Sequence, residues 1–215
     1  CTSDLNAWVN ILKEFSDTFG FHISGDELYG GLFRKALEGD KDCGGLVACN
    51  YVSGEPVAGF AEGRPLFVRR QDGRFNLANF MRVNLYTALG ALKTGMDILK
   101  REEGVQSDRI MGHGGLFKTK GAGQQIMADA MEIPVAVMET AGEGGPWGMA
   151  LLASYMLNKE SDETLAHYLS EKVFAGNKGT SMDPDPEDVK GFETFIERYK
   201  KGIAIEKAAL ENLIV

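Results

Sequence analysis

The residues whose types and spacing could bind a ligand lie in the run GHGGLFKTKGAG, from Gly112 to Gly123. Lys118 and Thr119 match the Lys-Thr pair that ends a phosphate-binding P-loop. A P-loop needs a glycine directly before the lysine, and here the residue is Phe117, whose side chain would fill the space of the β-phosphate. A dinucleotide-binding G-x-G-x-x-G fingerprint fails at the same position, because its third glycine would fall at Phe117.

Two interpretations of this run remain open. In the first, the glycines only allow a strand-to-helix turn and no ligand binds. In the second, a strand ends at Gly114 and Gly115, whose bare backbone lies flat against an adenosine, because side chains there would block the ring. Lys118 and Thr119 would then lie at the mouth of the pocket and donate hydrogen bonds to ribose or phosphate oxygens.

A second glycine-rich turn favours the ligand-binding interpretation. It has the sequence AGEGGPWGMALLA at residues 141–153, and Gly144 and Gly148 are spaced to share one helix face. Small residues on that face allow a flat ligand to approach, and tight packing of the helix on a strand would also explain them. Two such turns in consecutive βα units would lie side by side at the carboxyl ends of the strands, where ligands bind in open α/β sheets.

Hydrophobic periodicity and capping residues predict the elements that position these turns. We expect helices over about 2–19, 24–38, 76–103, 121–132, 146–157 and 161–173, and one charged helix from 185 onward. We expect strands over 45–52, 65–70, 109–111 and 134–139, and loops over 53–65 and 174–186. The order α-β-α-β-α over residues 76–157 indicates an α/β layered domain. The last helix should pack across this domain as a brace, with its charged residues in solvent.

Composition narrows the function classes. The chain has 215 residues, 44% of them apolar, which suits one large domain or one domain with an appendage. Its net charge of -8 and the lack of a basic stripe argue against nucleic acid and anionic membrane surfaces as partners. No apolar run is long enough to span a membrane, and no signal peptide is present.

The cysteines and histidines indicate no metal site. The three cysteines and three histidines show no Cys/His ligand spacing, which favours a reduced, cytoplasmic protein. The sequence starts at Cys1 directly in an amphipathic helical pattern, so we expect it to be a fragment of a longer protein.

Residues 111–153 resemble the C-terminal domain of the FGGY carbohydrate kinases. That family has a Gly-Gly adenosine loop, a helix with a Gln-x-x-Ala-Asp pattern, a Pro-Val strand, and a Gly-rich turn leading to a Gly/Ala-rich helix. The matching segments here are Gly114-Gly115, Gln125 to Asp129, Pro134-Val135 and Gly142 to Ala153. NYVSGE at 50–55 and the helix at 79–89 are also similar to family segments, although Asn79 and Tyr86 stand where His and Glu are frequent. The sequence most resembles pentulose kinases of xylulokinase or ribulokinase type, over residues 1–173.

The resemblance implies an α/β fold of the actin-like ATPase (ribonuclease H-like) class, here a partial chain without its first strands. It divides the sequence into an ATP-binding C-terminal kinase domain at 1–160 and a helical extension at 161–215 that packs on it. The implied partners are a small-molecule sugar and the N-terminal half of the same kinase, in the cytoplasm, and a homodimer is left open.

The implied chemistry is phosphoryl transfer from ATP, with Mg2+, to a primary hydroxyl of a ketose. Gly114 and Gly115 would make room for the nucleoside, with Leu116 and Phe117 lining it and Lys118 and Thr119 at its polar edge. Glu143 could reach the ribose. No catalytic residue and no metal ligand is assigned, because the family's catalytic aspartate and phosphate loop precede the segment that this sequence resembles. Two alternatives stay open, namely a non-catalytic regulatory module that binds a nucleotide or sugar, and a partner-binding domain whose glycines serve only packing.

Overall fold

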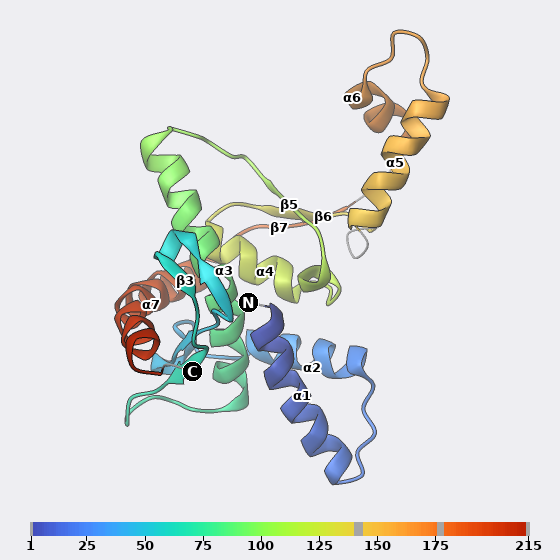
Figure 1. The fold of residues 1–215 in the computed structure, drawn as a ribbon. Coiled ribbons are helices and arrows are strands. Elements are labelled where there is room, and N and C mark those ends of the chain that lie inside the picture. The colour runs from blue at the N-terminus through green and yellow to red at the C-terminus, as the bar shows by residue number, and fades with distance from the viewer. Residues whose placement is uncertain (1, 140–143, 176–178, 214–215) are drawn as a thin grey trace.

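The computed structural model describes residues 2–139, 144–175 and 179–213 of the chain (Figure 1). Its helices are α1 (Thr2–Thr18), α2 (Gly25–Leu37), α3 (Leu77–Glu102), α4 (Ala122–Met131), α5 (Gly144–Asn158), α6 (Leu165–Tyr168) and α7 (Pro186–Asn212). Short 3-10 turns are η1 (Cys43–Gly45), η2 (Pro56–Ala58) and η3 (Gly115–Phe117), and a π-helical turn, η5 (Leu169–Val173), follows α6. The strands are β1 (Val47–Cys49), β2 (Ser53–Glu55), β3 (Phe60–Glu62), β4 (Leu66–Val68), β5 (Ile110–Gly112), β6 (Val135–Val137) and β7 (Thr180–Met182).

A three-stranded sheet in the order β5-β6-β7 carries the glycine-rich loop. Strands β5 and β6 are parallel and are joined through η3 and α4, and β7 pairs antiparallel with β6. Gln124 of α4 ties the sheet together, because its Nε2 donates to the carbonyl oxygens of Val135 at 2.7 Å and Thr180 at 2.9 Å. The predicted α-β-α-β-α order over residues 76–157 is confirmed. The prediction of a loop over 174–186 is wrong, since Thr180–Met182 forms the third strand.

The remaining strands form two small antiparallel pairs, β1 with β4 and β2 with β3. The predicted strands at 45–52 and 65–70 are therefore confirmed in shorter form. The segment 53–65 was expected to be a loop and instead holds the β2–β3 hairpin. Gly59 closes that hairpin with φ of 79°, a conformation that glycine adopts without steric cost.

Capping residues explain where the predicted helices begin. Ser24 and Glu27 form a capping box at the start of α2, with reciprocal side-chain to backbone hydrogen bonds of 3.3 and 3.1 Å. Asn76 caps α3 by accepting from the Asn79 N–H at 2.9 Å. Asp185 caps α7 and is followed by Pro186 in the first helical turn.

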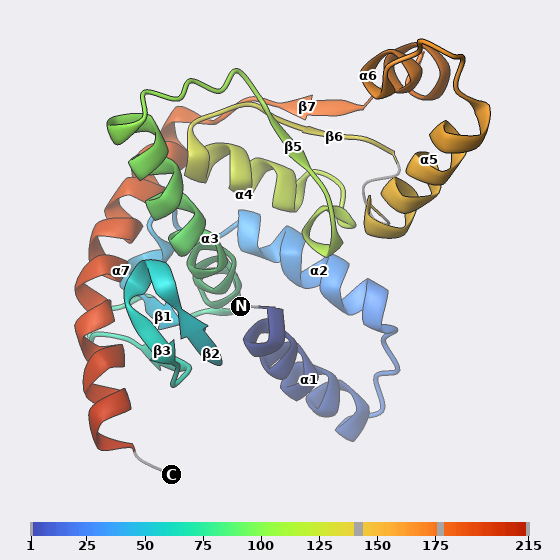
Figure 2. The same cartoon turned by 45° about the horizontal axis from the view of Figure 1, so that its top comes forward.

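Helix α7 lies alongside α3 and β1, as Figure 2 shows. The expectation that the charged residues of this helix lie in solvent is wrong at Asp188 and Glu206, which are buried. Phe192, Phe195 and Tyr199 of α7 are buried. The ring of Tyr86 on α3 lies 4.8 Å from the ring of Phe192 and 5.3 Å from that of Phe195, in edge-to-face arrangements that favour aromatic packing.

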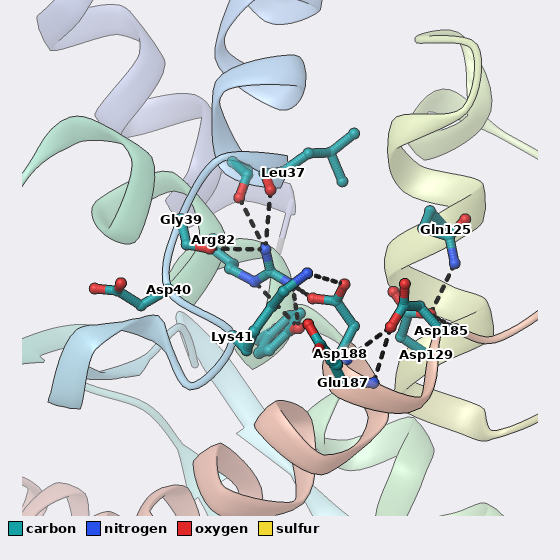
Figure 3. A network of polar contacts seen from close by, with 12 residues as sticks. Leu37, Gly39, Asp40, Lys41, Arg82, Gln125, Asp129, Asp185, Glu187 and Asp188 are labelled. Atoms are coloured by element: carbon teal, nitrogen blue, oxygen red, sulfur yellow. Dashed lines mark hydrogen bonds and ion pairs between the residues drawn. The ribbon is translucent and has the colours of Figure 1, made fainter.

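A buried network of polar groups fixes α2, α3, α4 and α7 relative to one another (Figure 3). Arg82 of α3 is 1% exposed, forms an ion pair with Asp188 of α7, and donates to the Gly39 carbonyl after α2 at 3.2 Å. Asp129 of α4 accepts from the Asp185 N–H at 2.8 Å. These contacts place the end of α4 beside the start of α7 and hold the loop-bearing unit to the rest of the body.

Helices α5 and α6 extend away from this body (Figures 1 and 2). No helix among residues 2–139, 144–175 and 179–213 combines the length and apolar character needed to cross a membrane. The proposed division of the chain at residue 160 stays a prediction.

Candidate functional site

The loop after β5 forms one wall of a cleft of about 690 Å³. Gly115, Leu116, Lys118 and Thr119 supply this wall, and helices α1, α2 and α3 supply the others. The volume lies in the range of small-molecule sites, which is about 300–1,000 Å³. The structure therefore brings four residues predicted from the sequence to one concave surface.

The glycines of the loop have different structural roles. Gly114 has φ of 100°, a conformation that side chains disfavour, so it sets the direction of the turn. A Cβ on Gly115 would meet no atom within 4 Å, so this glycine adjoins open space. By contrast, a Cβ on Gly112 would lie 2.6 Å from the Phe117 ring, and one on Gly123 would lie 2.2 Å from the Leu116 carbonyl oxygen. Packing and turn geometry therefore explain Gly112, Gly114 and Gly123, and they leave Gly115 unexplained.

Phe117 does not line the cleft, contrary to expectation. Its side chain is 9% exposed and packs with Ala128 and Val135 beneath the sheet. The missing side chain of Gly112 leaves room for its ring, since a Cβ there would overlap the ring edge. Phe117, which is incompatible with a P-loop, therefore packs the loop onto the domain. Leu116 lines the cleft instead.

The inner wall of the cleft is apolar. Its side chains are Leu5 from α1, Phe33 from α2, and Leu85, Ala88 and Leu89 from α3. An apolar wall of this kind excludes water and suits the faces of an aromatic ring.

Polar groups gather on the α1 and α2 side of the cleft. The Tyr29 hydroxyl donates to Oδ1 of Asn6 at 2.6 Å, and Asp26 lies in the first turn of α2. Burial raises the pKa of Tyr29 above its usual value, so its phenol stays neutral at physiological pH. The sequence did not single out Asn6, Asp26 or Tyr29, because their approach to the loop depends on how α1 and α2 pack and leaves no local pattern.

The other predicted site residues lie elsewhere. Gly114 shapes the turn and is not part of the cleft wall. Glu143 lies outside the described residues. Gly144 and Gly148 belong to α5, and a Cβ on Gly148 would meet no atom within 4 Å, so no described neighbour requires a glycine there. Because β5 and β6 are parallel, their carboxyl ends lie at the same edge of the sheet. The start of the second glycine-rich turn, at residues 141–143, lies outside the described residues.

The Gln-x-x-x-Asp segment of α4 holds the fold together. Asp129 accepts from Gln125 Nε2 at 2.8 Å and from the backbone N–H of Asp185, at the start of α7. Burial raises the pKa of Asp129, and these donors offset part of that effect. Gln125 also donates to the Asp183 carbonyl at 3.0 Å. This motif thus joins α4 to the brace helix and contributes no atom to the cleft.

Within the described part of the chain, no group of three or more His, Cys, Asp or Glu side chains is arranged to hold a metal ion. A Mg2+ ion commonly binds through substrate phosphates with only one or two carboxylates. The described residues therefore form no protein-only metal cage.

Comparisons with known proteins agree with this geometry. Residues 1–157 match the family model for the C-terminal domain of the FGGY family of carbohydrate kinases. No curated protein matches the sequence at a significant level.

Solved structures of sugar kinases have a similar fold. Xylulose kinase from Rhodospirillum rubrum superposes with a TM-score of 0.65 at 18% identity, over 95% of this chain and 38% of that kinase. Gluconate kinase from Lactobacillus acidophilus gives 0.62 at 18% identity, over 86% of this chain and 37% of that one. Glycerol kinase from Plasmodium falciparum, solved with ADP, gives 0.58 at 16% identity, over 86% and 34%. The chain thus spans under two fifths of the length of these kinases.

The loop, the α-β-α-β-α order and the family match over residues 1–157 agree, and the chain belongs to the FGGY family of carbohydrate kinases, of which it contains the C-terminal domain.

Proposed function

We propose that the cleft between α1, α2, α3 and η3 binds the adenosine portion of ATP. The observation that carries this proposal is the open space beside Gly115, on a loop whose other glycines have structural roles. The apolar wall would exclude water from the base, and Lys118 and Thr119 on the loop wall would donate to ribose or phosphate oxygens. Glu143, which follows β6 in the sequence, would bind the ribose.

The full-length protein would then be an ATP-dependent kinase that phosphorylates a ketose of xylulose or ribulose type. Phosphoryl transfer relies mainly on positioning and on neutralising the charge of the phosphates, and bound Mg2+ supplies part of that charge. This chain would contribute by orienting the nucleoside, and the N-terminal half of the same kinase would bring the sugar and the catalytic base. The chain alone should therefore phosphorylate no sugar.

Further features of the assembly belong to the same proposal. The fold would be the C-terminal part of an actin-like ATPase, with residues 1–160 as the ATP-binding domain and 161–215 as an extension packed on it. The kinase would work in the cytoplasm.

The substitution Gly115→Val tests the cleft. A valine side chain would enter space that no protein atom fills, so the fold should keep its melting temperature while nucleotide binding is lost. In the full-length enzyme we expect the KM for ATP to rise at least about tenfold, equivalent to 1.4 kcal/mol, with D-xylulose or L-ribulose as acceptor. An unchanged KM for ATP would contradict the proposal.

Gly123→Ala is the matched control. Its Cβ would overlap the Leu116 carbonyl, so we expect a lower melting temperature.

If wild-type protein binds ADP–Mg in calorimetry but phosphorylates neither sugar, a non-catalytic regulatory module is the better account. If it gives no heat and no shift in melting temperature, the glycines serve only packing.

A further inference from the structure

Two polar side chains of the cleft fix each other's direction. Asn6 lies on α1 and Tyr29 lies on α2, and both line the cleft. The Tyr29 hydroxyl donates to Oδ1 of Asn6 at 2.6 Å. Because burial raises the pKa of Tyr29, the hydroxyl keeps this proton at physiological pH. The hydrogen bond therefore has one direction, from the phenol to the amide oxygen.

The surroundings of Tyr29 hold its hydroxyl in place before a ligand binds. The ring packs edge-to-face on the ring of Phe33, with 6.1 Å between the centroids, and Phe33 also lines the cleft. The capping box of Ser24 and Glu27 anchors the first turn of α2, just before Tyr29. A side chain that is fixed in this way loses little conformational freedom when it binds a ligand.

The shared hydrogen bond decides what this pair offers to a ligand. An asparagine amide has an oxygen that accepts and an NH2 group that donates. Because Oδ1 of Asn6 takes the proton of Tyr29, Nδ2 is the amide group that can face a ligand, and it only donates. The oxygen of Tyr29 has used its proton, so it accepts. The pair thus presents a donor next to an acceptor.

Asp26 adds a second acceptor to this side of the cleft. It precedes Tyr29 by three positions on α2, so the two side chains lie on one face of the helix, and Asp26 also lines the cleft. A carboxylate accepts hydrogen bonds and donates none. The polar side of the cleft therefore combines two acceptors on α2 with one donor on α1.

We propose that Asn6, Tyr29 and Asp26 bind the polar edge of a 6-aminopurine and thereby set the preference for adenine nucleotides. This rests on the proposed function, which places the adenosine of ATP in this cleft. The 6-amino group of adenine has two N–H donors beside a ring nitrogen that accepts. The amino group donates to Tyr29 and Asp26, and the ring nitrogen accepts from Nδ2 of Asn6. A 6-oxopurine puts a carbonyl oxygen against those two acceptors, which leaves them unpaired.

Calorimetry with ADP and inosine diphosphate on the full-length protein tests this assignment. The two nucleotides differ only in the base, where inosine has a 6-oxo group and an N1–H in place of the 6-amino group and the bare N1. We expect ADP to bind at least about tenfold more tightly than inosine diphosphate. Equal affinities would overturn the proposal, and so would tighter binding of inosine diphosphate or of guanosine diphosphate.

The substitution Asn6→Asp gives a second readout, because it replaces the donor by an acceptor without changing the size of the side chain. We expect the ratio of the ADP affinity to the inosine diphosphate affinity to fall at least about tenfold. Any effect of the added charge on the phosphates cancels in this ratio.

Asn10→Asp is the matched control. It makes the same change on the same helix, at an exposed position that does not line the cleft, so the ratio should equal that of the wild type. Equal ratios in the two variants would contradict the role of Asn6.

The same measurements separate this proposal from the proposed function. Wild-type protein that binds ADP without preferring it to inosine diphosphate would reject the base assignment and leave the adenosine site standing. Wild-type protein that binds neither nucleotide would reject the proposed function, and the base assignment with it.

Discussion

Glu206 of α7 is a fully buried carboxyl group with incomplete hydrogen bonding. Its Oε1 accepts from the Arg64 backbone N–H at 2.6 Å, whereas its Oε2 has no hydrogen-bond partner among the described residues. Burial raises the pKa of Glu206, and the Arg64 backbone and side chain lower it by less. Because the folded state holds this proton more tightly than the unfolded state, ionising Glu206 costs stability.

Glu206→Gln should therefore change how stability depends on pH. In the wild type, the contribution of Glu206 is largest below its ordinary pKa of 4.5 and is lost as the pH rises through the higher folded pKa. The glutamine keeps the acceptor for Arg64 and cannot ionise. We expect the variant to gain stability relative to the wild type as the pH rises above 4.5, by about 1.4 kcal/mol for each unit of the folded pKa shift.

Urea unfolding at several pH values between 4 and 8 measures this difference. A variant that loses stability relative to the wild type as the pH rises would show that the buried carboxylate is stabilised in its charged form.

At the candidate site, four of the loop residues predicted to line the cleft do so, whereas Gly114 and Phe117 do not. Gly115 could be predicted to adjoin open space, because a bare backbone at a strand end is a local feature. The burial of Phe117 could not, since it depends on the room left by Gly112 on the preceding strand. Asn6 and Tyr29 reach the cleft only through the packing of α1 on α2, for which the sequence has no local signal.

At the scale of elements, Arg82 of α3 joins the helices of the core. It forms an ion pair with Asp188 of α7 and donates to the carbonyls of Leu37 and Gly39 at 3.3 and 3.2 Å. Lys41 also pairs with Asp188, at 2.5 Å. Three helices therefore depend on one guanidinium group.

Replacing Arg82 by leucine should destabilise the fold strongly. The change removes one of the two positive charges that pair with the Asp188 carboxylate. It also removes the guanidinium donor from the carbonyl oxygens of Leu37 and Gly39. We expect the free energy of unfolding to fall by about 3–5 kcal/mol, as for other broken buried pairs. Arg101→Leu is the control, because Arg101 is 73% exposed and its pair with Asp97 should contribute about 1 kcal/mol or less. Similar losses in both variants, measured by urea unfolding, would argue against the network.

The elements that the sequence predicted best have strong local signals. The long helix α3 begins at Asn76, which caps it, and carries a regular apolar stripe. The β2–β3 hairpin and β7 were missed because their strands lack the apolar runs that mark β1, β4, β5 and β6. Their pairing is set by tertiary contacts, such as the hydrogen bond from Gln124 to the Thr180 carbonyl.

At the scale of the molecule, the chain combines a well-packed body with surfaces that it does not cover itself. The core between α3 and α7 and the network around Arg82 make the body that supports the cleft. Within the described chain, Met149, Met156 and Leu157 of α5 are exposed, and no strand pairs with the outer edge of β5. This contrast fits one domain of a larger kinase, in which the cleft would supply the nucleoside half of the site under the proposed function.

A crystal structure of the protein soaked with ADP and Mg2+ tests the central claim most directly. The account predicts density for the adenine against Leu116 and the apolar wall of α3, for the nucleoside beside Gly115, and for the phosphates toward Lys118 and Thr119. Density for ADP elsewhere, with the space beside Gly115 filled by the protein's own atoms, would contradict it.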